Sequence, residues 1–131
     1  MGNYLKQNGW ENYQGLDLEP PADIVGDITQ WQELGMQAES YDVIVAFEVV
    51  EHVDLYAACQ DLLKPGGRLL VTTPLPHTDW FMKLLEIVGL NQKRTSPHCN
   101  LHYLNSVDRL ELTTKRWVAG LSQWGIFTKA A

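Results

Sequence analysis

The sequence predicts an α/β fold with a mostly parallel sheet and an antiparallel edge at its C-terminal end. The run at 41–47, YDVIVAF, is short, apolar and rich in β-branched residues. Such a run is typical of a strand that is covered on both faces of a parallel sheet. Strand-like and helix-like segments alternate around it, and two strand-like segments come last. This order favours a parallel sheet with an antiparallel edge.

Length, charge and cysteine content limit the kinds of protein that this chain can be. Its 131 residues fit a single domain over 1–131. The formal net charge of -6 argues against a broad nucleic-acid surface, which needs clustered Lys and Arg. No apolar run approaches the roughly 20 residues that span a bilayer, and the N-terminus lacks the apolar core of a signal peptide. Two cysteines are too few for a disulfide framework, so we expect a reducing, cytoplasmic compartment.

The elements before residue 41 are predicted to be short. Gly9 ends a helical stretch, and Thr29 caps a weakly amphipathic one. Between them lie two strands that each end at an acid, and Pro20-Pro21 separates these strands. The four segments are a helix end at 5–8, strands at 14–18 and 23–28, and the amphipathic segment at 30–38.

After residue 47 the pattern alternates between helices and strands. A helix capped by Asp54 carries five apolar residues on one face at helical spacing, namely Leu55, Ala58, Cys59, Leu62 and Leu63. The run at 64–67, KPGG, is typical of a turn, because proline fixes φ and glycine permits left-handed geometry. The remaining segments are strands at 68–73, 110–113 and 124–129, a helix at 80–88 and a polar loop at 91–105.

Two carboxylates and an imidazole follow the apolar strand at 41–47. They belong to Glu48, Glu51 and His52. Because open α/β sheets bind ligands at the carboxyl ends of their strands, this polar tip is the first candidate for a functional site.

Two motifs around this tip resemble the class I S-adenosylmethionine (SAM)-dependent methyltransferases. The first is the run at 41–53, YDVIVAFEVVEHV, and the second is the run at 62–74, LLKPGGRLLVTTP. A strand followed by Glu-His, a helix, LKPGG and another strand is quite specific to that superfamily. The run at 120–129 is similar to the final strand of small bacterial members. The resemblance implies a Rossmann-like fold and SAM-dependent methyltransferase activity.

The resemblance also implies that six residues bind SAM. The carboxylate of Asp17 would accept hydrogen bonds from the ribose hydroxyls, and that of Asp27 from the adenine amino group. The two aspartates could instead only cap turns, as aspartate often does. Their joint spacing ahead of the Glu-His pair favours the cofactor role. The six residues are Asp17, Leu18, Asp27, Ile28, Phe47 and Glu48.

The chain departs from these enzymes at one place. They carry a first strand and a glycine-rich loop, G-x-G-x-G, and no such motif occurs here. The run at 4–10, YLKQNGW, looks like the end of the helix that follows this loop, so a truncated form of the fold is expected. We therefore expect that the strand ending at Asp17 pairs directly with the strand at 41–47, or that a homodimer covers the gap. A truncated gene product is the third explanation.

The spacing E-x-x-E-H of Glu48, Glu51 and His52 also suggests a metal site. One helical turn separates Glu48 from the other two residues, so all three would face one side, and His98 or His102 would supply a fourth ligand. The set resembles the divalent-metal site of small-RNA 2′-O-methyltransferases and of ubiquinone-pathway O-methyltransferases, where a metal lowers the pKa of substrate hydroxyls. Many methyltransferases with Glu-His bind no metal, and there His52 would be a general base.

These observations lead to one main functional prediction and two alternatives. The main prediction is transfer of a methyl group from SAM to a hydroxyl or amine of a small molecule, with Glu51 and His52 as catalytic residues. One alternative is a non-catalytic methyltransferase-fold module that binds a partner, and the other is a metal-binding module. Four aromatic residues could stack on an aromatic acceptor, although such residues are more often core at helix and strand positions: Trp80, Phe81, Trp117 and Trp124.

Overall fold

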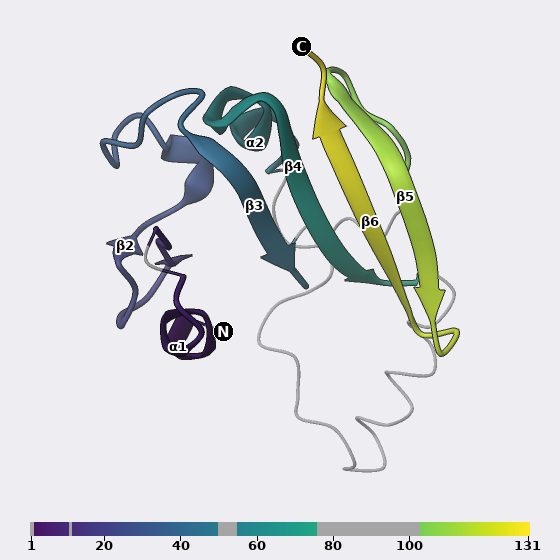
Figure 1. The fold of residues 1–131 in the computed structure, drawn as a ribbon, viewed down its shortest axis with the longest axis horizontal. Coiled ribbons are helices and arrows are strands. Elements are labelled where there is room, and N and C mark those ends of the chain that lie inside the picture. The colour runs from purple at the N-terminus through teal and green to yellow at the C-terminus, as the bar shows by residue number, and fades with distance from the viewer. Residues whose placement is uncertain (1, 11, 50–54, 76–102) are drawn as a thin grey trace. The chain divides into compact units, whose positions relative to one another are not determined.

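The computed structural model describes residues 2–10, 12–49, 55–75 and 103–131. The chain divides into two compact units, Met1–Gln37 and Ala38–Ala131, which we treat separately. Their helices and strands are shown in Figure 1. No helix in the described ranges is long and apolar enough to cross a membrane. The helix predicted at 80–88 lies outside the described residues.

The first unit contains short elements, as predicted. Helix α1 covers Gly2–Gln7 and ends just before Gly9, whose φ of 82° is left-handed. Strands β1 (Leu16–Asp17) and β2 (Ile24–Val25) pair in parallel. Each of the two predicted strands is therefore present, and each is shortened to two residues.

The cap of the next element differs from the prediction. The segment predicted to be amphipathic contains only the end of a 3-10 helix, η1 (Ile28–Gln30), followed by turns. Asp27, rather than Thr29, is the N-cap. Its Oδ1 accepts hydrogen bonds from both the backbone N–H and the hydroxyl of Thr29, each at 2.8 Å. The N–H groups at the start of a helix lack partners within the helix. A carboxylate accepts a stronger hydrogen bond from them than a threonine hydroxyl does.

The second unit contains a four-stranded sheet with the strand order β3-β4-β6-β5. β3 and β4 are parallel, and β6 runs antiparallel to both β4 and β5 (Figure 1). The predicted α/β fold with an antiparallel C-terminal edge is confirmed. The four strands are β3 (Tyr41–Phe47), β4 (Leu63–Pro74), β5 (Leu110–Val118) and β6 (Ser122–Lys129).

One face of this sheet packs against helix α2 (Tyr56–Leu62). Leu69 on β4 and Phe127 on β6 lie opposite each other on this face, and both are fully buried. The ring of Tyr56 meets the ring of Phe127 edge-on, with 5.6 Å between the ring centroids. Three residues of the predicted apolar face, Ala58, Cys59 and Leu62, lie on α2 and are buried. Leu55, the N-cap, and Leu63, the first residue of β4, lie outside the helix and are also buried.

Within the described part of the second unit, β3 is partly exposed on the opposite face of the sheet, whereas the sequence predicted a strand covered on both faces. Val43, Val45 and Phe47 alternate along β3 and are 49%, 41% and 44% exposed. Trp124 on β6 lies in line with Phe47 on this face and is 53% exposed. A run of β-branched residues indicates a strand, but it does not show whether a second layer covers that strand.

The KPGG run lies within strand β4, where it forms a bulge. The sequence analysis predicted a turn before the strand. From Leu63 to Arg68 the chain of β4 advances five residues while the opposite residues on β3 advance two. Gly66 has a φ of 75°, and a Cβ added to Gly67 would lie 2.8 Å from the carbonyl oxygen of Lys64. One glycine is therefore required by its dihedral angle and the other by the space around it.

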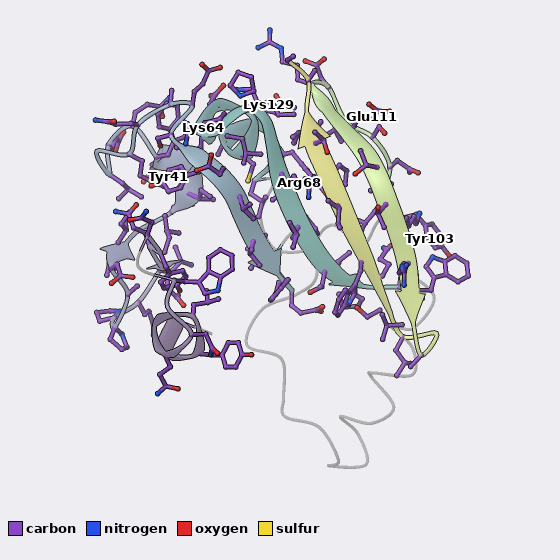
Figure 2. The ribbon with its side chains drawn as sticks, viewed as in Figure 1. Tyr41, Lys64, Arg68, Tyr103, Glu111 and Lys129 are labelled. Carbon is purple, nitrogen blue, oxygen red and sulfur yellow. The ribbon has the colours of Figure 1, made fainter. Side chains whose placement is uncertain are left out.

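Lys64 and Lys129 form ion pairs at the end of the sheet where β3 begins (Figure 2). The Nζ atom of Lys64 lies 2.8 Å from a carboxylate oxygen of Asp42. The Nζ atom of Lys129 donates to the carbonyl oxygen of Leu63 at 2.8 Å and lies 3.1 Å from Oε1 of Glu39. Because the Lys129 side chain is only 10% exposed, this contact joins the last strand to the junction of α2 and β4.

The predicted direct pairing between the strand that ends at Asp17 and the strand at 41–47 is not found. β1 pairs with β2 in a two-stranded sheet, whereas β3 is the outermost strand of the four-stranded sheet. β1 has two residues and is soon followed by Pro20-Pro21, so it is too short to match the seven residues of β3.

The turn between β5 and β6 offers a stabilising substitution. Ala119 and Gly120 both have a positive φ, and the Leu121 N–H donates to the Val118 carbonyl at 3.0 Å, as in a type I′ turn. Asparagine tolerates left-handed geometry better than alanine does. Ala119→Asn is therefore expected to raise the free energy of unfolding by about 0.5–1 kcal/mol in urea denaturation. The same change at the exposed Ala130 should leave it unaltered, and a destabilised Ala119 variant would contradict this account.

Burial of Cys59 is expected to make the fold less stable at alkaline pH. Burial raises the pKa of this thiol from 9.0 to about 12. The unfolded chain then loses its thiol proton from about pH 9 while the folded chain keeps it, so the stabilisation is complete below pH 9 and is lost towards pH 12. Between about pH 8 and pH 10, wild type should lose roughly 1 kcal/mol more unfolding free energy than Cys59→Ala. Equal losses in urea titrations of the two proteins would exclude this effect.

Candidate functional site

The carboxyl end of β3 carries a strained residue. Glu48 directly follows the strand with a φ of 54°, a conformation that is uncommon outside glycine and often marks functional sites. Its backbone N–H donates to the carbonyl oxygen of Thr72 on β4 at 2.9 Å, which fixes Glu48 at the tip of the parallel pair.

At the other end of β3, burial raises the pKa of Tyr41. That phenol is therefore protonated at neutral pH and is no candidate for a general base.

Four residues form a row across the sheet at this carboxyl end. The strand registers place Phe47 opposite Thr72, Thr72 opposite Trp124, and Trp124 opposite Arg116. Directly opposed residues point to the same face. On this face Phe47, Trp124 and Arg116 are exposed, whereas Thr72 between them is buried. The row combines two exposed aromatic rings with a guanidinium that can bind a carboxylate or phosphate. Sequence reasoning missed Thr72 and Arg116, because the pairing of β3 with β4 and of β6 with both β4 and β5 is what brings them into line.

In the first unit, Asp17 and Asp27 follow neighbouring parallel strands. Asp17 is the last residue of β1, and Asp27 comes two residues after β2. The Gly26 N–H donates to the Asp17 carbonyl at 2.8 Å, so both acids lie at the same edge of the strand pair. Leu18 beside them is 70% exposed. Acceptor-only oxygens next to an open apolar side chain suit a ribose diol and a flat base, so these residues fit the nucleoside part of SAM.

The two acids differ in how the fold already uses them. Oδ1 of Asp27 holds the N–H and the hydroxyl of Thr29, so this residue does cap a turn, as the alternative interpretation proposed. Asp17 is exposed, and within the described ranges its carboxylate accepts one hydrogen bond, from the Glu19 N–H at a long 3.4 Å. Asp17 is therefore the better-placed acid for binding a ligand, and Ile28 follows Asp27 as the first residue of η1.

The predicted catalytic pair and most of the predicted metal ligands lie outside the described residues. These are Glu51, His52, His98 and His102. Only Glu48 of the metal set is described, and no group of three or more His, Cys, Asp or Glu residues that could hold a metal occurs in the described part of the chain. The metal site and the catalytic pair stay predictions.

Comparison with known proteins gives relatives of one kind. A ubiquinone biosynthesis O-methyltransferase of Xanthomonas axonopodis pv. citri (strain 306) is 34% identical over 89 residues, which are 65% of this chain and 37% of that protein. One from Roseobacter denitrificans is 43% identical over 49 residues, covering 34% of this chain and 20% of that protein. The mitochondrial one of Rattus norvegicus is 46% identical over 46 residues, covering 32% and 13%. The chain thus spans well under half the length of these relatives.

A solved structure and a family model complete the comparison. The crystal structure of the PH0226 protein from Pyrococcus horikoshii OT3 has a TM-score of 0.66, and the match covers 98% of this chain and 77% of that chain. With 13% sequence identity, this likeness shows a shared fold alone. Residues 1–111 match the family model described as "Methyltransferase domain". Because this match takes in most of the 131 residues, the chain belongs to the methyltransferase domain family, as its resemblance to class I SAM-dependent methyltransferases predicted.

Proposed function

We propose that this chain is the SAM-binding domain of a methyltransferase that acts on a hydroxyl group of a small molecule. Family membership supports methyl transfer. Of the predicted hydroxyl and amine acceptors, the hydroxyl is favoured because three relatives are named O-methyltransferases. The observation that carries the proposal is the edge of the β1–β2 pair, where Asp17 and Asp27 lie together. We place the reaction in the cytoplasm, where a thiol such as that of Cys59 stays reduced.

In this proposal, some side chains bind SAM and others remove the proton of the acceptor. SAM, when bound, supplies a methyl group on a sulfonium that an oxygen nucleophile attacks in line. Asp17 binds the ribose hydroxyls through its two carboxylate oxygens. His52 takes the proton of the acceptor hydroxyl, and Glu51 is the second candidate for the base. Most of the rate increase comes from alignment of the two reactants. The other residues that the sequence assigns to SAM binding are Leu18, Asp27, Ile28, Phe47 and Glu48.

Substitution of Asp17 tests the proposal. Asp17→Ala removes both acceptor oxygens from an exposed residue, so the fold should be unaffected while the affinity for S-adenosylhomocysteine falls. Loss of a hydrogen bond to a charged group costs about 1.5–3 kcal/mol, which corresponds to roughly a 10- to 150-fold higher Kd in calorimetric titration.

Asp42→Ala is the matched control for this measurement. Asp42 is also an exposed aspartate, and its carboxylate pairs with Lys64. This variant should bind S-adenosylhomocysteine like wild type. If wild type binds neither SAM nor S-adenosylhomocysteine at millimolar concentration, the enzyme proposal fails, and the non-catalytic module becomes the better explanation.

A further inference from the structure

Residues 103–106, which we call the strap, lie against the large sheet without being one of its strands. The backbone of Leu104 is held there by two side chains. Its N–H donates to Oε1 of Gln123 on β6 at 3.0 Å, and Gln123 is fully buried. Its carbonyl oxygen accepts a hydrogen bond from Nζ of Lys115 on β5 at 2.8 Å. Both backbone groups of Leu104 are therefore satisfied by side chains of the two C-terminal strands.

A glycine in β6 makes room for the strap. The side chain of Leu104 is buried, and a Cβ added to Gly125 would lie 2.7 Å from its Cδ1 atom. Glycine inside a strand often marks such a close approach. Next to Leu104, the ring of Tyr103 lies with its centroid 5.5 Å from Nζ of Lys115 (Figure 2 labels Tyr103). The strap thus has a defined docked position on the sheet.

The hydrogen bonds that hold the strap differ from those that hold the strands. A third one runs from the Leu112 N–H to Oγ of Ser106 at 2.9 Å, so again one partner is a side chain. With the other described residues, 104–106 form no backbone-to-backbone hydrogen bond, whereas β5 and β6 pair backbone to backbone. A segment held by a few side-chain bonds can detach at a lower free energy than a strand in a ladder.

The strap is docked at the carboxyl end of β4. Gln123, which holds it, is the register partner of Thr73 on β4. The residue before Thr73 is Thr72, whose carbonyl oxygen accepts the hydrogen bond from the Glu48 N–H. Open α/β sheets bind their ligands at this end. A local opening of the strap therefore changes the surroundings of the end of the sheet at which we propose that methyl transfer takes place.

We infer that the strap opens locally while the four-stranded sheet stays folded, and that the ammonium group of Lys115 holds it closed. This ammonium binds a neutral carbonyl and faces an aromatic ring, and it forms no ion pair with the residues that the structure describes. A hydrogen bond from a charged donor is roughly twice as strong as a neutral one, so the Lys115 bond contributes most to closure. Because the opening is a property of the fold, it can be measured without turnover of any substrate.

Native-state amide hydrogen exchange of the full chain measures the opening. In wild type, the Leu104 amide should exchange at least about tenfold faster than the amide of Leu69, which lies in the centre of the sheet. Low urea should hardly change the Leu104 rate, because a local opening exposes little surface. Lys115→Met keeps the length of the side chain and removes its charge. It should speed Leu104 exchange by roughly 10- to 150-fold, the effect of losing a hydrogen bond to a charged group, and leave Leu69 unchanged.

Lys64→Met is the matched control, because Lys64 pairs with Asp42 and makes no contact with the strap. It should leave the Leu104 rate as in wild type. If the Leu104 and Leu69 amides of wild type exchange at the same rate and with the same urea dependence, the strap opens only with the sheet and the inference is overturned. This comparison needs no variant. A Lys115→Met protein in which Leu104 is unchanged, or in which Leu104 and Leu69 are accelerated equally, also overturns it.

Discussion

Replacing Phe127 with alanine is expected to lower the free energy of unfolding by about 3–5 kcal/mol. Phe127 is fully buried on β6, and its ring packs against Tyr56 of α2 with 5.6 Å between centroids. Alanine leaves a cavity between the helix and the sheet, and single domains have only about 5–15 kcal/mol of stability in total. The variant should therefore unfold at a much lower urea concentration, measured by far-UV circular dichroism.

Trp124→Ala is the control for this prediction. Trp124 is also an aromatic residue of β6, but it lies on the exposed face and is 53% accessible. Its removal should change the unfolding free energy by no more than about 1 kcal/mol. If both variants are equally destabilised, the face that carries Trp124 is covered and the assignment of the two faces is wrong.

Replacing His52 with alanine is expected to lower kcat about 100- to 10,000-fold. This prediction depends on the proposed function, in which His52 removes the proton of the acceptor hydroxyl. The assay follows release of S-adenosylhomocysteine from SAM, with a hydroxylated aromatic such as catechol as the probe acceptor. The affinity for S-adenosylhomocysteine should stay within about twofold of wild type, because the imidazole acts on the acceptor and not on the nucleoside.

A second histidine and a chelator separate the possible roles of His52. His77→Ala makes the same chemical change outside the Glu-His motif and should retain activity. If His52 is a general base, the acid limb of the pH profile should disappear in His52→Ala, and EDTA should not alter wild-type activity. If EDTA abolishes activity and Mn²⁺ restores it, the predicted metal site of Glu48, Glu51, His52 and His98 is the better account. Full activity of His52→Ala would exclude both roles.

Much of the second unit could be predicted, because local patterns decide it. The β-branched run gave the bounds of β3 correctly, and the 3.6-residue spacing identified the buried face that includes Ala58, Cys59 and Leu62. Both signals depend on the apolar burial that creates the core. Strand β1 ends at Asp17, inside the predicted strand, whereas β2 ends at Val25, two residues before Asp27. Proline or glycine after a short strand is the local signal that made both strands predictable.

What failed depends on contacts between distant parts of the chain. Exposure of Val43 and Trp124 follows from which layers cover the sheet, and strand composition does not contain that information. Glu48 has a positive φ, and its N–H donates to Thr72, 24 residues later, a distant contact that a local pattern cannot show. Aspartate and threonine are both favoured as N-cap residues, so the sequence alone could not show that Asp27 rather than Thr29 caps η1.

The strand order has a consequence for synthesis of the chain on the ribosome. Of the four strands in the large sheet, β6 is made last, yet it lies between β4 and β5. While the polypeptide is emerging, β5 has no partner strand to join, and β4 has only β3 beside it. Because domains otherwise fold progressively from the N-terminal end, completion of this sheet must wait for β6. During that interval the nascent chain exposes the strand edges that chaperones recognise.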